Sequence, residues 1–174
     1  MNKHLISMIA ATTLAVTLIP AANAAGGRFH RQNAAGGITA GSGHTHAGPN
    51  GGGFARGRRV VTDGEGNGAA SSGAAFRGPN GGSGARAGHT EHSADGTTTH
   101  QSGMQATGAN GSTINSQGSF TKNADGTTSG ERNTTATNAN TGTTYNGSTS
   151  YNKDTGVTHT GTCTDASGAA VACR

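Results

Sequence analysis

Short strand-like runs alternate with glycine turns through the second half of the sequence. Thr recurs in the runs between residues 93 and 156, together with Ile114, Tyr145 and Tyr151, and helix formers are a minority in them. Asp-Gly, Asn-Gly and related turns separate the runs at a nearly constant interval. These turns are Asp95-Gly96, Asn110-Gly111, Asp125-Gly126, Asn140-Thr141-Gly142 and Asp154-Thr155-Gly156. Such dipeptides between β-favouring runs are the strongest short hairpin signal, so each interval predicts one strand.

The repeating unit is about 30 residues long, because Asn-type and Asp-type turns alternate. Gly-Pro-Asn-Gly-Gly occupies residues 48–52 and recurs at 78–82, and Ala-Asp-Gly-Thr-Thr occupies residues 94–98 and recurs at 124–128. A fixed internal period predicts a repeat architecture. Residues 25–90 carry a decayed, glycine-rich version of the unit. Because glycine weakens strands, this segment is predicted to be largely disordered.

Pairing the strands about the turns distinguishes a meander from a solenoid. With each hairpin centred on its turn, Phe120 is predicted to lie opposite Gln101, and its row continues through Glu131, Tyr151 and His159. Side chains alternate between faces along a strand. One predicted face therefore collects the apolar residues Ile114, Phe120, Tyr145, Tyr151, Val157 and Cys163. The opposite face is mostly polar, with Met104 as its main large apolar residue.

A solenoid with a 15-residue coil would instead stack Phe120 on Gln105 and Thr135, which gives a polar interior. The sequence therefore favours a mostly β fold, an antiparallel β-meander of ~15-residue strand-turn units over residues 91–174. A solenoid and disorder are the alternatives. A sheet with one thin apolar face and an open edge rarely stands alone, so a second layer, another copy or a surface is expected to cover it.

Residues 1–24 have the features of a secretory signal peptide. Lys3 supplies a positive start, Leu5 to Ile19 an apolar stretch, Pro20 a break, and Ala22-Asn23-Ala24 a small-residue cleavage motif. The apolar stretch is shorter than the ~20 residues that span a bilayer, which disfavours a membrane anchor. The mature chain is predicted to begin at Ala25, to lack a transmembrane segment, and to reside in the periplasm, on the cell surface or outside the cell.

Composition and charge divide the exported part into two segments. With 32 Gly, no Trp and 3% aromatic residues, the 174-residue chain has too little apolar surface for a conventional core. Residues 25–90 are basic, whereas residues 91–174 carry a small excess of carboxylates. A soft boundary near residue 90 therefore separates a Gly/Arg-rich segment from a Thr/Asn/Gly-rich repeat domain.

Cys163 and Cys173 lie near the C-terminus of the predicted exported chain. Disulfides persist in oxidising compartments, so a single staple that stops the last strand from fraying is predicted. The alternative, a pair of metal-binding thiolates, is disfavoured because the spacing of the two cysteines is longer than zinc sites use.

Two histidine clusters are candidate metal ligands. They are His44-Thr45-His46 and His89-Thr90-Glu91-His92. In a strand, a His-x-His pair places both imidazoles on one face, and His with Glu can bind borderline metals. The alternative interpretation is that all four histidines are ordinary solvated side chains of a glycine-rich segment.

Arg56, Arg58 and Arg59 form the densest basic cluster. The guanidinium fork is suited to phosphate and carboxylate groups. Anionic polysaccharide, lipopolysaccharide and extracellular DNA are therefore candidate partners. The alternative is a plain charged linker.

The sequence contains no nucleophile elbow, paired catalytic carboxylates, cofactor motif or calcium-loop spacing. No enzymatic activity, cofactor or small-molecule substrate is therefore expected. The leading hypothesis is an exported structural or surface- and matrix-associated repeat protein that associates with itself through Ile114, Phe120, Tyr145 and Tyr151. The alternative is a small periplasmic protein that binds metal through its histidine clusters.

Overall fold

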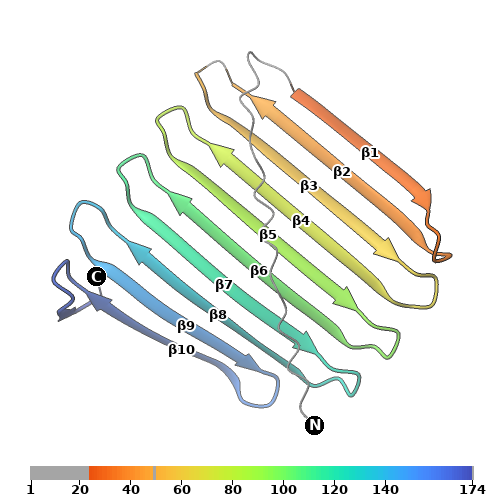
Figure 1. Ribbon diagram of the computed structural model, residues 1–174. Helices are drawn as coiled ribbons and strands as arrows, with labels where there is room; N and C mark the ends of the chain where they lie inside the picture. The colour runs from red at the N-terminus through yellow and green to blue at the C-terminus, as the bar shows by residue number, and fades with distance from the viewer. Residues whose placement is uncertain (1–23, 49, 174) are drawn as a thin grey trace, which may run out of the picture.

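The chain forms a single antiparallel sheet of 11 strands that follow one another in sequence order (Figure 1). The computed structural model describes residues 24–48 and 50–173. All of the predicted signal segment except Ala24 lies outside the described residues. The strands are β1 (Ala24–Gln32), β2 (Ile38–Ala47), β3 (Gly53–Thr62), β4 (Gly68–Arg77), β5 (Ser83–His92), β6 (Thr98–Thr107), β7 (Thr113–Lys122), β8 (Thr128–Thr137), β9 (Thr144–Asn152), β10 (Gly156–Thr164) and β11 (Ala170–Val171).

The predicted meander of regular strand-turn units is confirmed, and it extends further towards the N-terminus than expected. The segment predicted to be largely disordered forms strands β1 to β5 of the same sheet, and the expected boundary near residue 90 falls inside β5. Glycine does not prevent this, because ladder hydrogen bonds come from the backbone. A row of paired glycines, Gly27, Gly43, Gly57 and Gly73, crosses β1 to β4.

Most turns have three loop residues rather than the two assumed from the sequence. In the turn between β6 and β7, Gly108 N donates to Ser112 O at 2.7 Å, and Gly111 N donates to Gly108 O at 2.9 Å. Gly111 has a φ of 84°. This is a type I turn followed by a left-handed glycine, which needs one positive φ where a type I′ turn needs two. The turn between β8 and β9 has four loop residues, since Asn138 N donates to Thr143 O.

The longer turns shift the predicted register by one residue. Phe120 pairs with His100 and Gly130, and the predicted row through Gln101 and Glu131 is wrong. A one-residue shift moves a side chain to the other face. Met104 consequently lies on the same face as Phe120, against the prediction. The shifts at successive turns cancel between alternate strands, which is why Phe120 and Tyr151 still share a face.

The two faces of the sheet differ in chemistry. We call the aromatic face the one formed by even-numbered residues of β1 to β8 and odd-numbered residues of β9 and β10. The other, which we call the polar face, carries mostly Thr, Ser, Asn, Gln, Ala and Gly in its strands. Every large hydrophobic residue found exposed lies on the aromatic face, with the exception of Phe29.

The sheet has almost no buried core in its described part. The one buried hydrophobic residue is Cys163, which is 7% exposed, and the buried polar residues are Thr39 and Ser116. Aromatic rings instead cover strand glycines. The rings of Phe120 and Tyr151 stack at a centroid distance of 6.4 Å on either side of Gly130. This local packing shields backbone but leaves the rings partly open to solvent.

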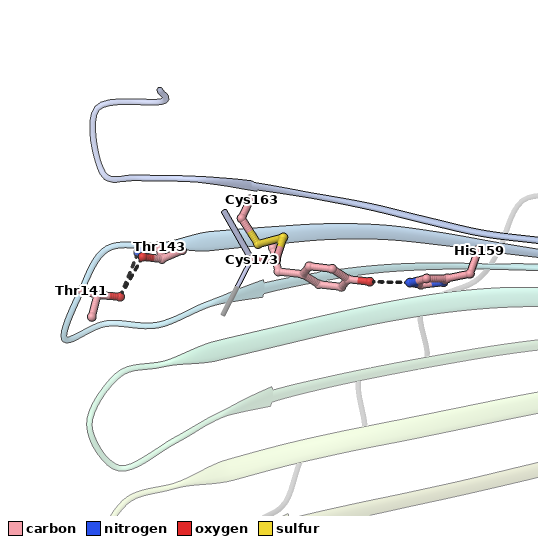
Figure 2. Close-up of a disulfide and its surroundings, with 6 residues drawn as sticks. Thr141, Thr143, His159, Cys163 and Cys173 are labelled. Atoms are coloured by element: carbon pink, nitrogen blue, oxygen red, sulfur yellow. Dashed lines mark hydrogen bonds between the residues drawn. A yellow bond between two sulfur atoms is a disulfide. The ribbon is translucent and has the colours of Figure 1, made fainter. Parts of the chain in front are cut away.

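The predicted disulfide between Cys163 and Cys173 is confirmed (Figure 2). It joins residues whose Cα atoms are 5.3 Å apart and closes the C-terminal end onto β10. Strand β11 pairs with β10 only at Cys163 and Thr164. The bridge therefore fixes a very short strand that has few backbone bonds of its own.

Candidate functional site

The aromatic face is divided into rows that run across the strands. We call two apolar rows the outer rows: one holds Phe54, Phe76, Ile114, Tyr145 and Cys163, and the other holds Val60, Phe120, Tyr151 and Val157. A polar row with Thr62, His92 and Lys122 lies beyond the second. The two rows between the outer rows hold Arg28, Arg56, Arg58, Arg86 and Arg132, together with Met104 and small residues. Basic side chains thus form a central band that is bordered by apolar side chains.

A shallow hollow of about 710 Å³ lies in this central band. We call it the arginine hollow, because Arg56, Arg58, Arg86 and Arg132 line it. The other long side chains around it are His44, His100 and Met104. The space exists because neighbouring positions of the same rows are small: Ser42, Ser72, Ala74, Gly88 and Ser102. Long basic side chains therefore surround a floor of glycine, serine and alanine.

No carboxylate lies on the aromatic face within the described strands. Glu91 and Glu131 belong to the polar face, as their partners Ala69 and Ser119 show. The remaining acidic residues are in the connections between strands: Asp63, Glu65, Asp95, Asp125, Asp154 and Asp165. Among the described residues, the one ion pair within 4 Å joins His89 Nε2 and Glu91 Oε1 at 3.2 Å, on the polar face. The four guanidinium groups of the hollow are therefore not neutralised.

Hydrogen bonds hold Arg132 across its neighbouring strands. Its Nη1 donates to Ser116 Oγ on β7 at 3.0 Å, and its Nη2 donates to Ser102 Oγ on β6 at 3.2 Å. Gly118 lies between Ser102 and Arg132 in the same row. A Cβ atom at Gly118 would lie 3.5 Å from Arg132 Cζ, so the glycine allows the guanidinium to lie close to the sheet. A guanidinium has five N–H donors, and several stay free for a ligand.

The carboxylates in the turns accept hydrogen bonds from nearby turn residues and do not form an acid-base site. Hydrogen bonding to Thr97, chiefly from its backbone N–H, lowers the pKa of Asp95. The hydroxyl and backbone N–H of Thr127 likewise lower the pKa of Asp125. The same effect lowers the pKa of Asp63, chiefly through the Asn67 side chain, and of Asp165, chiefly through the Ser167 hydroxyl. These groups stabilise the turns as ions at neutral pH.

The two predicted histidine clusters are arranged differently. His44 and His46 share the aromatic face of β2, and their rings lie 5.5 and 5.8 Å from the ring of Phe54. His89 and His92 lie on opposite faces of β5, and His89 contacts Ser71 and Glu91. In the part of the chain that the structure describes, no three His, Cys, Asp or Glu side chains are placed to hold a metal ion.

The structure divides the predicted polyanion cluster. Arg56 and Arg58 line the arginine hollow, whereas Arg59 lies on the polar face opposite Gly41 and Ser71. Sequence reasoning missed Arg86 and Arg132. The repeat period could have found the first, because Arg86 follows Arg56 by one whole repeat unit and lies two strands away in the same row.

The residues predicted to mediate self-association share the aromatic face. Ile114 and Tyr145 lie in one outer row, and Phe120 and Tyr151 lie in the other. The Tyr145 hydroxyl also hydrogen-bonds His159 Nε2 at 3.1 Å, which is the dashed line to His159 in Figure 2. His159 Nδ1 contacts Thr149 Oγ1 at 2.8 Å. On β7 to β10 this face carries these four apolar side chains with Val157 and Cys163, and its Arg and Lys side chains are Lys122 and Arg132.

Comparisons with protein-family models, curated proteins and solved structures found no match to this chain. The described residues include no helix that could cross a membrane. Arguments about function therefore depend on the chain's own chemistry.

Proposed function

We propose that this chain is an exported, non-enzymatic structural protein that associates with further copies of itself through the C-terminal part of its aromatic face. The observation that carries the proposal is the single-layered sheet with almost no core. Phe120 is 37% exposed, Tyr151 38% and Val157 67%. Burial of apolar surface is the main favourable term in folding and association. Much of the apolar surface of this sheet is exposed, and a second layer would bury it.

Charge indicates which part of the aromatic face makes the contact. On β1 to β5 this face carries Arg28, Arg56, Arg58 and Arg86, so stacking two copies there would bring like charges together. On β7 to β10 its strand cations, histidines aside, are Lys122 and Arg132. A two-fold axis would place the same patch of each copy against its partner. The apolar region around Ile114, Phe120, Tyr145 and Tyr151 is suited to that contact.

The edges of the sheet offer a second route to assembly. Every residue of β1 is exposed, and among the described strands β1 pairs with β2 alone (Figure 1). Residues 156–162 of β10 are likewise unpaired on the side of β11. Unpaired strand edges template pairing with another chain. Face contacts and edge contacts can be told apart, because only the first depend on aromatic side chains.

The test compares two phenylalanines that both cover a strand glycine. Phe120 lies over Gly130 on the aromatic face, and Phe29 lies over Gly41 on the polar face. Sedimentation velocity of the purified protein over a concentration series should show association for the wild type. The variant Phe120→Ser with Tyr151→Ser should remain monomeric, and Phe29→Ser should behave as the wild type. A wild type that stays monomeric at high concentration refutes the proposal.

Export and a structural role rest on separate arguments. The cleavage motif Ala22-Asn23-Ala24 supports export, and N-terminal sequencing of the secreted protein should begin at Ala25. The turn carboxylates are engaged in backbone hydrogen bonds, which supports a structural use of the acidic residues. Support for the metal-binding alternative is weaker: within the described residues His44 and His46 share a face of β2, but His89 and His92 lie on opposite faces of β5.

A further inference from the structure

We propose that the arginine hollow binds an anionic polysaccharide, whose sulfate, phosphate or carboxylate groups contact the four guanidiniums. The site overlaps the self-association surface only at Arg132, since it lies mainly on β2 to β6, with Arg132 reaching in from β8. It differs from an ordinary charged surface in three respects, which are its isolation from carboxylates, its shape and the positioning of Arg132.

The first respect is electrostatic. Surface arginines are commonly paired with nearby acids, but each carboxylate of the described strands is on the polar face. Arg56, Arg58, Arg86 and Arg132 thus converge without a neutralising partner. A group of like charges that repel one another is stabilised by a bound anion, and arginine binds oxyanions with two parallel N–H bonds.

The second respect is shape. The strands that line the hollow run from β2, with Ser42 and His44, to β6, and Arg132 of β8 reaches back to Ser102 on β6. Adjacent strands are ~4.8 Å apart, so the four intervals from β2 to β6 span roughly 19 Å. Arg56 and Arg86 are two strands apart in one row, which places their Cα atoms ~9.6 Å from each other. A single small anion would contact one or two of these arginines, whereas a polymer with repeated charges can contact all of them.

The third respect is preorganisation. Ser102 and Ser116 fix the Arg132 guanidinium above Gly118 before any ligand binds. Less side-chain entropy is then lost on binding than for a free surface arginine. The small floor residues, among them Ser72 and Gly88, allow a chain with hydroxyl groups to approach the sheet backbone.

The lining favours a polysaccharide over a nucleic acid. Single-stranded nucleic acids are held by stacking of bases on aromatic rings as well as by charge. The residues that line the hollow include no Phe, Tyr or Trp. The Phe and Tyr rings of this face lie in the outer rows, beside the hollow and not within it.

The test uses two double variants with the same charge. Arg58→Gln with Arg132→Gln removes two arginines of the hollow, and Arg59→Gln with Arg77→Gln removes two arginines of the polar face. Each lowers the formal net charge from +4 by two. Arg58 and Arg59 are sequence neighbours, so the comparison holds local composition nearly constant. Circular dichroism and urea unfolding of each variant establish that the sheet is intact.

Binding of the full chain to heparin, to polygalacturonate and to a single-stranded oligothymidylate is measured by titration calorimetry at several salt concentrations. The hollow variant should lose about tenfold or more in heparin affinity, and the polar-face variant less than about threefold. Binding to heparin but not to polygalacturonate would assign sulfate as the group recognised, and binding to both would show that carboxylate is sufficient. Equal losses in the two variants would overturn the proposal, because net charge alone would then explain binding. Tighter binding of the oligothymidylate would overturn the choice of polysaccharide.

Discussion

A change of one turn glycine to alanine should lower the stability of the sheet, whereas the same change in a strand should raise it. Gly126 has a φ of 82°, and a Cβ atom added there would have nothing within 4 Å. Its N–H donates to Asn123 O at 2.9 Å, which closes the turn between β7 and β8. The cost of Gly126→Ala is therefore purely conformational. A left-handed conformation costs an L-residue roughly 1–2 kcal/mol.

Part of this cost is offset in the unfolded state. Alanine has fewer unfolded conformations than glycine, which stabilises the fold by roughly 0.4–1 kcal/mol. The net loss expected for Gly126→Ala is thus about 1 kcal/mol. Gly73 in β4 is the matched control, because it lacks a positive φ and its Cβ would meet only Arg86 O at 3.7 Å. Gly73→Ala gains the same unfolded-state term without strain.

The assay is urea unfolding followed by far-ultraviolet circular dichroism at a concentration where the protein is monomeric. With a slope of about 2 kcal/mol per molar urea, the midpoint should fall by about 0.5 M for Gly126→Ala and rise by about 0.2–0.5 M for Gly73→Ala. Gly126→Asn should lose less than Gly126→Ala, because asparagine tolerates the left-handed region. Shifts of the same sign for the two alanine variants would refute the assignment of turn strain to Gly126.

Two further changes test the turns and the repeat. Asp95 and Asp125 have lowered pKa values, so their contribution to stability is present above the ordinary carboxyl pKa of 3.8 and is lost as pH falls through the lower folded value. Asp95→Asn with Asp125→Asn should reduce the acid dependence of the urea midpoint below about pH 4, and an unchanged dependence would contradict the assigned hydrogen bonds. Deletion of residues 98–127 removes two strands and should leave a cooperatively unfolding sheet. Deletion of residues 98–112 removes only one strand but places Ile114 opposite Glu91, so its urea midpoint should be lower than that of the 98–127 deletion. A higher midpoint for the 98–112 deletion would contradict the face assignment.

The strand positions could be predicted from the sequence because the turn glycines mark them directly. Glycine is needed where φ is positive, as at Gly96, Gly111 and Gly126, and those positions kept the regular interval visible. The disorder predicted for residues 25–90 was wrong because glycine content was taken as weakness of the strands. In the sheet, Gly43 and Gly57 pair directly and contribute backbone bonds without side chains.

The register was harder to predict, since the same dipeptide fits turns of different loop length. An Asn-Gly pair read as a type I′ turn places Gln101 opposite Phe120, whereas the observed type I turn with a left-handed glycine places His100 there. That single residue decides which side chains share a face. In the observed register Met104 lies on the aromatic face. The predicted register did not indicate the arginine hollow, because the hollow requires Arg56, Arg86 and Arg132 on one face.

The parity of the repeat explains why two strands, and not one, form the unit of this chain. Side chains alternate between the two faces along a strand. A single strand-turn unit has an odd number of residues, so equivalent positions in successive units lie on opposite faces. Two units together have an even number, so positions one full repeat apart lie on the same face. Arg28 and Arg58, and likewise Arg56 and Arg86, are one full repeat unit apart and lie on one face. The longer loop between β8 and β9 adds one position, and from there the aromatic face carries odd numbers, as at Tyr145 and Tyr151. Whole repeat units can therefore be gained or lost without mixing the two faces, so the basic rows and the apolar rows can lengthen together as the sheet grows.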